Sequence, residues 1–352
     1  MRVFAEREYS RRTLNAQSQS ATFVSRITQM KGKMSEQLET VQPAIAGRSP
    51  GQIAWMRFKR NKVGVAAALV SLTILLLSAF APIVCRILGI DPNTLNLEAL
   101  DSSGVPKLPN GGISLEHPLG LIPGTGRDLL AQLLYGSRIS FLVAFLTTAL
   151  ALTIGLFIGI AGGYFRGRVD DALGRFTDFF LAFPAFFMIV ALSTPVVQRI
   201  QSWNIGGDNF ARIVFLIFFL SFFGWPGFSR LIRSQAMSLR ERDFVMAAQA
   251  AGASSRRIII KEMLPNLWPT AIVFLSLSLP GYLSAEAVFS FLGVGIQAPA
   301  STWGLVLSDA VSFWRQDPAY LVIPSIMLVI VVLSLNLLGD AVRDALDPKA
   351  TH

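Results

Sequence analysis

The longest polar interruption in this apolar sequence is DFVMAAQAAGASSRRIIIKEMLPN, Asp243–Asn266. Alanines dominate its first half, which predicts a helix with a surface of small side chains. Gly252 follows them and predicts the end of that helix, because glycine is common just past a helix terminus. Ser254 is expected to cap a second helix over 256–264, which we expect to end at Pro265. Such a smooth helix suits close approach by another protein's backbone, although an ordinary alanine-rich connecting helix fits the same composition.

The composition indicates a protein of the membrane. The chain has 352 residues, of which 52% are hydrophobic and 15% charged. Several runs exceed about 18 residues with almost no charge, which is typical of membrane helices. We therefore predict an all-α, polytopic membrane protein. The single cysteine, Cys85, excludes an internal disulfide, and the two histidines, His117 and His352, are too far apart in sequence to suggest a metal site.

Six spans are predicted from the apolar runs. Because six crossings return the chain to its starting side, both termini are expected on one face. Prolines and glycines are expected to interrupt three of the spans. The predicted spans are 63–88, 139–163, 176–197 with breaks at Pro184 and Pro195, 213–228 with a distortion over Gly224–Gly227, 268–294 with a break at Pro280–Gly281, and 319–338. Asp178, near the start of the third, is expected to pair with Arg175 one turn earlier.

The polar segments divide the rest of the chain. We expect a disordered cytoplasmic tail over residues 1–50, and an amphipathic helix on the membrane surface over 51–62. The proline- and glycine-rich segment 89–135 is predicted to be an extracytoplasmic loop. A core over 136–340, which contains the alanine-rich loop 240–265, precedes a short cytoplasmic tail over 341–352.

The net charge of +9 is distributed beside the spans, which argues against nucleic-acid binding. Basic residues concentrate on one side of the predicted membrane, so that side is cytoplasmic by the positive-inside rule. Both termini and the alanine-rich loop are thus predicted to be cytoplasmic. The cytoplasmic set is Arg57, Lys59, Arg60, Lys62, Arg166, Arg168, Arg175, Arg230, Arg233, Arg240, Arg242, Arg256, Arg257, Lys261, Arg343 and Lys349; the outer set is Arg86, Lys107, Arg127, Arg138, Arg199, Arg212 and Arg315.

The alanine-rich loop resembles the EAA loop of ABC importer permeases. The residues that carry the match are Ala247, Ala248, Gly252, Leu264 and Pro265, with Ala253 beside the glycine. Met246 stands where the family has a glutamate. In that family the loop is a coupling helix that docks in a groove of a separate ATPase subunit, and the resemblance places Ala248 where that surface comes close.

Three further stretches resemble the dipeptide and oligopeptide branch of these permeases. The first is WMRFKRNK (Trp55–Lys62), which leads into the first span, and the second is HPLGLIPGTGRDLLAQLLYGSRIS (His117–Ser140). The third is SFLGVGIQAPASTWGLVL (Ser290–Leu307), followed by NLLGDAVRDALDPK (Asn336–Lys349). With the first span, the resemblance covers most of residues 51–349. In the external loop we expect His117 to fix the chain by a hydrogen bond, and Arg127 and Asp128 to form a local ion pair or a helix cap.

Glu286 is the acidic residue that lies well inside a predicted span. An ionised acid near the middle of the membrane costs about 2.5–3.5 kcal/mol on insertion scales, so it should face protein or water. Two roles stay open: Glu286 contacts substrate in the pathway, or it bonds neighbouring helices. Pro280 and Gly281, less than two turns earlier, are further candidates for the pathway lining.

The resemblance implies a type I, six-span permease in a bacterial inner membrane, importing short peptides. It also implies a second permease subunit, two ATPase subunits that bind ATP and magnesium, surrounding membrane lipid and an extracytoplasmic substrate-binding protein. The chain itself has no G-x-x-x-x-G-K-[ST] motif and is expected to hold no cofactor and no catalytic residue. Related permeases carry nickel complexes, glutathione or other solutes, which remain alternatives. An ion-coupled secondary transporter and a membrane-bound enzyme are the rivals from other classes.

The charge asymmetry generates a topology test. In a Cys85→Ser background, Asn110→Cys should react with an impermeant thiol reagent added to sealed cells, because the loop over 89–135 is predicted to be external. Ser254→Cys should react only after the cells are opened. Labelling of Ser254→Cys in sealed cells would contradict the predicted topology.

Overall fold

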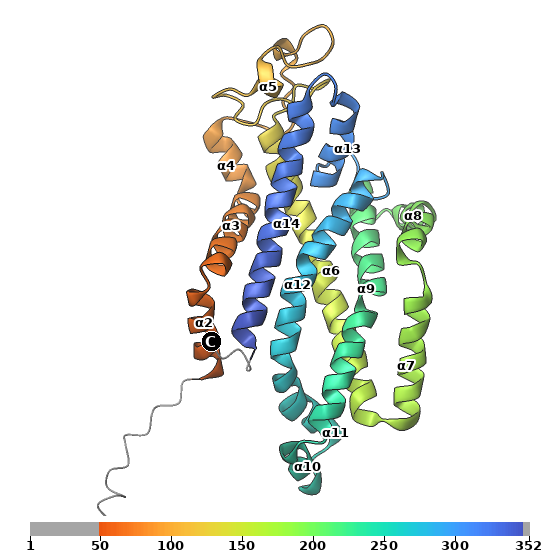
Figure 1. Cartoon of the computed structure of the whole chain (residues 1–352). Coiled ribbons are helices and arrows are strands. Elements are labelled where there is room, and N and C mark those ends of the chain that lie inside the picture. The colour runs from red at the N-terminus through yellow and green to blue at the C-terminus, as the bar shows by residue number, and fades with distance from the viewer. Residues whose placement is uncertain (1–48, 348–352) are drawn as a thin grey trace, which may run out of the picture. The chain divides into compact units, whose positions relative to one another are not determined.

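The computed structural model describes residues 49–347, and every regular element within them is a helix. The only β-type pairings in this range are the isolated bridges Leu100–Pro106 and Leu121–Asp128. The predicted all-α class is confirmed. The predicted tails lie outside the described residues, apart from 49–50 and 341–347. From Ala54 onward the described helices pack into one unit, drawn in Figure 1.

In the described part of the chain, five helices are long and apolar enough to cross a membrane, and a bent pair makes a sixth when its two halves are counted as one span. The pair, α7 and α8, turns by 78° between its two halves at Phe183–Pro184, as predicted for Pro184. The six predicted spans therefore correspond to observed helices, and four of those helices are longer than predicted. They are α3 (Lys62–Ala79), α6 (Leu129–Phe165), α7 (Gly167–Ala182) with α8 (Ala185–Gln201), α9 (Asp208–Arg240), α12 (Leu264–Phe291) and α14 (Pro318–Leu346).

Glycines at every fourth position of α6 allow α9 to approach closely, and these two helices form the most extensive pair. Gly155, Gly159 and Gly163 lie on one face of α6 because residues four apart share a face. A Cβ atom added to Gly159 would lie 2.6 Å from the carbonyl oxygen of Ser229, and one added to Gly163 would lie 2.7 Å from that of Arg233. Small residues at this spacing are a common basis of helix packing in membranes.

Ion pairs join α7 to α9. Asp170 accepts hydrogen bonds from Nε and Nη2 of Arg233, the latter at 2.6 Å. Asp178 pairs with Arg230 on α9, so the predicted pairing with Arg175 on its own helix is wrong. The physical reason is that α7 packs along α9, which brings a cation from another helix to this carboxylate.

Prolines inside the spans interrupt fewer helices than predicted. Pro195, Pro226 and Pro280 all lie inside continuous helices, so the expected breaks at Pro195 and at Pro280–Gly281 are absent. The carbonyl freed by Pro280 is that of Ser276, four residues earlier. It lies against Gly339 of α14, where an added Cβ would be 3.0 Å away. A neighbouring helix thus covers the freed group, which is how membrane helices tolerate proline.

A short helix that the sequence analysis did not predict, α13 (Trp303–Phe313), packs among α6, α12 and α14. Thr302 caps its start, and Trp303 is 1% exposed and donates a hydrogen bond from Nε1 to the Leu133 carbonyl at 3.1 Å. Gly304 sits so close to α12 that an added Cβ would lie 2.0 Å from the Ala287 oxygen. The helix has 11 residues, too few to span a membrane, which is why the search for long apolar runs passed over it.

The first span is attached to α14. Ser71 of α3 donates a hydrogen bond to Ser334 of α14 at 3.0 Å, and both side chains are buried. The predicted span 63–88 is two helices, because α3 ends at Ala79 and α4 (Ala81–Leu88) follows with proline in its first turn. The amphipathic helix predicted over 51–62 is α2 (Pro50–Arg60), in which Lys59 lies over the Trp55 ring.

The contact between α6 and α9 can be tested with one methyl group. Gly159→Ala should lower the free energy of unfolding by about 1–3 kcal/mol, because the added Cβ overpacks a backbone contact. Gly227→Ala is the matched control, since a Cβ at Gly227 of α9 meets nothing within 4 Å. The measurement is thermal or denaturant unfolding of the purified permease in detergent. Equal stability of the two variants would contradict the proposed contact.

Candidate functional site

The alanine-rich helix α10 (Asp243–Ala250) ends in a Schellman motif. Gly252 adopts φ +77°, and its N–H donates to the Gln249 carbonyl at 2.9 Å. The N–H of Ala253 donates to the Ala248 carbonyl at 3.0 Å. Glycine has no Cβ penalty in this left-handed conformation, so the predicted end of the helix at Gly252 is confirmed.

Two positions anchor α10 to the rest of the chain. Val245 is fully buried, in a cluster with Tyr164 of α6, Ala236 of α9, and the following residues Ile258 and Met263. Ala248 and Ala253 are half-buried against the same cluster. Ala248, which we expected on the surface facing a partner, therefore packs against this chain's own core.

The opposite side of α10 is exposed and made of small or apolar side chains. Ala247, Ala250 and Ala251 are exposed, as is Gly252. Met246, which replaces the family's glutamate, is 49% exposed. The alanines and Gly252 on this side allow another protein to come close to the helix backbone.

After the turn at Gly252, the chain continues through α11 and η2 into α12 without a break. A short helix, α11 (Ser255–Arg257), is capped by Ser254 and runs into a π-helical turn, η2 (Ile258–Met263). The expected helix end at Pro265 is wrong. The proline falls in the first turn of α12, where its missing N–H is tolerated. Leu264 is half-buried and Pro265 exposed, so both belong to the base of this span.

Polar contacts attach the same region to α6 and α9. Arg240, the last residue of α9, donates a hydrogen bond to the Tyr164 carbonyl at 2.7 Å, and its guanidinium lies over the Tyr164 ring. Arg166, just after α6, pairs with Glu241, just after α9. Figure 1 shows α10 and α11 at the end where α9 finishes and α12 begins. The exposed helix is thus connected to three spans.

Glu286 lies inside this subunit. Its side chain is fully buried in α12, and its Oε1 accepts a hydrogen bond from Ser290 Oγ at 2.7 Å. The hydroxyls of Ser140 in α6 and Thr302 before α13 lie beside the same carboxyl group. Its Oε2 has no hydrogen-bond partner among the described residues. The acid therefore lies where α12 meets α6 and the start of α13, whereas Gly281 on the same helix is exposed.

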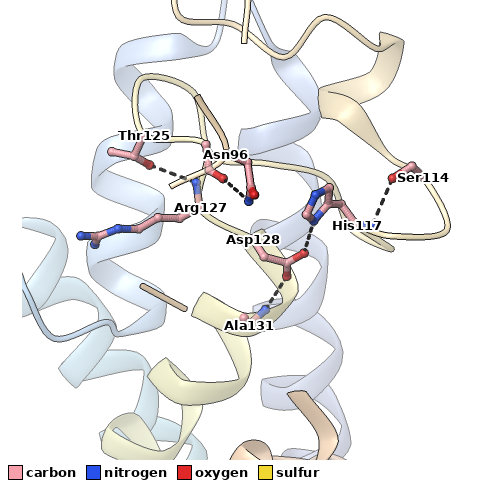
Figure 2. A network of polar contacts seen from close by, with 8 residues as sticks. Asn96, Ser114, His117, Thr125, Arg127, Asp128 and Ala131 are labelled. Atoms are coloured by element: carbon pink, nitrogen blue, oxygen red, sulfur yellow. Dashed lines mark hydrogen bonds and ion pairs between the residues drawn. The ribbon is translucent and has the colours of Figure 1, made fainter. Parts of the chain in front are cut away.

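In the external segment, Asp128 organises the start of α6 (Figure 2). Its Oδ1 accepts the Ala131 N–H at 2.8 Å, and its Oδ2 lies 2.8 Å from Nδ1 of His117. The carboxylate is 1% exposed. Of the two alternatives, the structure gives Asp128 the helix cap, and it gives His117 a hydrogen bond that fixes the loop.

The side chain of Arg127 extends away from Asp128 in Figure 2. It lines a cavity of about 70 Å³ together with Asp309 of α13 and Tyr320 of α14. Near Tyr320, burial raises the pKa of the Asp317 carboxyl, while backbone N–H groups of Ala319 and Tyr320 oppose the shift. Sequence reasoning did not find this cluster, because it forms only when the loop, α13 and α14 come together.

The chain matches two known families by sequence. Residues 151–352 match "Binding-protein-dependent transport system inner membrane component", and residues 49–99 match "N-terminal TM domain of oligopeptide transport permease C". Among solved structures, an inward-facing form of the MetNI methionine ABC transporter gives a TM-score of 0.47 at 19% identity, covering 62% of this chain and 98% of that one.

Curated relatives align over most of the chain. The oligopeptide transport system permease protein OppC of Haemophilus influenzae is 33% identical over 96% of this chain and 98% of the relative. The dipeptide transport system permease protein DppC of Alkalihalophilus pseudofirmus is 32% identical over 86% and 90%. OppC of Mycobacterium bovis is 36% identical over 84% and 93%. With its membrane-spanning helices, this chain belongs to the family of inner-membrane permease components of binding-protein-dependent transport systems.

Proposed function

We propose that this chain is one permease subunit of an ATP-driven importer of short peptides. The relatives above are named for oligopeptide and dipeptide transport, and they align over most of this chain. We propose that it pairs with a second, related permease subunit. A substrate-binding protein would deliver the peptide from outside, and two ATPase subunits would dock on the cytoplasmic face.

The observation that carries the proposal is the build of α10. Its buried side, at Val245, is fixed to the ends of α6, α9 and η2, while its other side exposes alanines. A helix that is rigidly attached on one side and smooth on the other can be pushed by a partner without bending. Since the sequence contains no G-x-x-x-x-G-K-[ST] motif, we assign ATP and magnesium binding to the partner subunits.

The proposed orientation follows from charge. Arg240, Arg256 and Arg257 lie around α10, and basic residues of the cytoplasmic set outnumber those of the outer set. The positive-inside rule then places α10 and both chain ends in the cytoplasm. The helix cap at Asp128 and the cavity at Arg127 are at the other end of α6, on the external side.

The proposed mechanism is a switch between two packed states. ATP-driven closure of the ATPase subunits would displace α10, and the anchors at Val245 and Arg240 would carry the displacement into α12, α9 and α6. Packed helices tend to move between discrete arrangements rather than deform continuously. Access to the pathway would change from the outside to the inside. We assign Glu286 to holding α13 against α12 and α6 during this change.

The exposed side of α10 gives the first test. Ala247→Trp should reduce recovery of the ATPase subunits and peptide uptake by at least about tenfold, because an indole would occupy the surface that the partner approaches. Membrane abundance should stay near normal, since Ala247 is exposed. Ser102→Trp, at an exposed external position, adds similar bulk and should change neither recovery nor abundance. Wild-type uptake by Ala247→Trp would reject this site.

Met246→Glu and Gly252→Leu extend the test. The acid should be tolerated, because Met246 is 49% exposed and a carboxylate there stays in water. Gly252→Leu should impair uptake through the backbone, because φ +77° costs an L-residue roughly 1–2 kcal/mol. A steric clash is not the cause, since nothing lies within 4 Å of a Cβ added at Gly252. Uptake and membrane abundance are measured together for both variants.

Two substitutions of Glu286 distinguish a packing role from a role in the substrate pathway. Glu286→Gln should keep both abundance and uptake near wild-type, because the amide oxygen can still accept from Ser290. Glu286→Leu should lower abundance, since it removes the buried acceptor of the Ser290 hydroxyl, at a cost of about 1–3 kcal/mol. If Glu286→Gln abolishes uptake at normal abundance, the acid serves the pathway and our assignment is wrong.

A further inference from the structure

A cavity of about 680 Å³ lies between the outer part of α3 and the first half of α6. Its size falls in the range of about 300–1,000 Å³ that is typical of ligand pockets. Most of its lining is apolar, with Leu75 of α3 facing Phe141, Leu142 and Phe145 of α6. Leu142 is 48% exposed and Phe145 is 39% exposed, so the cavity is open along this side of α6.

The external end of the cavity is built from hydrogen-bonded polar groups. Gln132 of α6 donates from Nε2 to the Pro92 carbonyl at 2.5 Å, and Ser301 Oγ donates to the Gln132 carbonyl at 3.0 Å. Both Gln132 and Ser301 are buried. These bonds hold Pro92, α6 and the residues before α13 together at this end of the cavity. The cavity is therefore polar at its external end and apolar along the rest of its length.

Arg138 lies at the junction of these two parts and is the only charged residue in α6. Its guanidinium lies over the Tyr135 ring at 5.8 Å, and it forms no ion pair with any residue in the described range. No acidic side chain lines the cavity. Tyr135, Arg138, Leu142 and Phe145 follow one another on a single face of α6, as the helical repeat dictates.

The depth of Arg138 matches the level of lipid headgroups. It lies nine residues before Thr147, the middle residue of α6. At about 1.5 Å per residue this is roughly 14 Å, against a half-thickness of about 15 Å for the hydrocarbon core. If α6 is centred in the membrane, an unpaired cation stands at the boundary between hydrocarbon and headgroups, and an apolar groove runs from it toward the membrane centre.

We propose that this cavity binds a phospholipid with an anionic headgroup. The phosphate accepts hydrogen bonds from Arg138, whose planar guanidinium suits bidentate contact with phosphate oxygens. One acyl chain lies against Leu142 and Phe145 and reaches Leu75. The lipid fills the space between α3 and α6, so it stabilises the packing of the first span on the core of the permease.

The experiment titrates the purified transporter complex in detergent with dioleoyl-phosphatidylglycerol or dioleoyl-phosphatidylcholine and counts bound lipid by native mass spectrometry. The wild-type complex should bind phosphatidylglycerol more tightly. Arg138→Gln should weaken that binding roughly tenfold and remove the preference, as expected for loss of a charged hydrogen bond. Arg315→Gln is the matched control, because Arg315 also lies over an aromatic ring, Trp314, but outside the cavity.

A second variant removes the space and keeps the charge. Ala79 is exposed on α3 and lines the cavity, so Ala79→Trp should fill it and reduce binding of both lipids. Equal lipid binding by wild-type, Arg138→Gln and Ala79→Trp complexes would overturn the proposal. Loss of the second permease subunit from both variants, with lipid binding unchanged, would also overturn it, since the cavity would then be a contact between subunits.

Discussion

The arrangement of this permease depends on how closely α6 and α9 approach each other. Gly155, Gly159 and Gly163 place no side chain of α6 between the two backbones, and an added Cβ would fall within 3.0 Å of a carbonyl oxygen of α9 at each position. One end of α6 begins at the Asp128 cap, and the other ends at Phe165, next to Tyr164, which packs in one cluster with Val245 of α10. Because α9 leads directly into α10, the spacing of this pair fixes α10 relative to the loop that precedes α6.

Around this pair, hydrogen bonds and ion pairs between polar side chains fix other helices to one another. Asp170 and Arg233 join α7 to α9, and Ser71 and Ser334 join α3 to α14. Within α12, the buried Glu286 accepts a hydrogen bond from Ser290. Each of these contacts pairs groups that would otherwise be costly to bury. The exposed side of α10 has the opposite character, with small side chains and no such pairing. Under the proposed function, packing within the subunit and docking of the ATPase subunit would therefore rest on different chemistry.

The sequence predicted the features that depend on a few consecutive residues. The spans follow from apolar runs, and the stop at Gly252 follows from the conformations that glycine allows. The partner of Asp178, the burial of Ala248 and the continuity of α12 through Pro280 depend on which helices are neighbours, so local patterns were insufficient. The helix α13 was missed because it is too short to resemble a span. The glycine repeat of α6 was visible in the sequence, and its spacing of four predicts that some helix packs closely on this face, but the identity of that helix as α9 comes from the structure.

The central claim is that the exposed side of α10 touches the ATPase subunit. Site-specific photo-crosslinking in the assembled transporter tests it most directly, with a photoreactive residue placed at Ala247 and, separately, at Val245. The account predicts crosslinks to the ATPase subunit from Ala247, which is exposed, and none from Val245, which is fully buried in this chain's own core. Crosslinks from Ala247 to an extracytoplasmic binding protein, or no crosslink to the ATPase subunit, would contradict it.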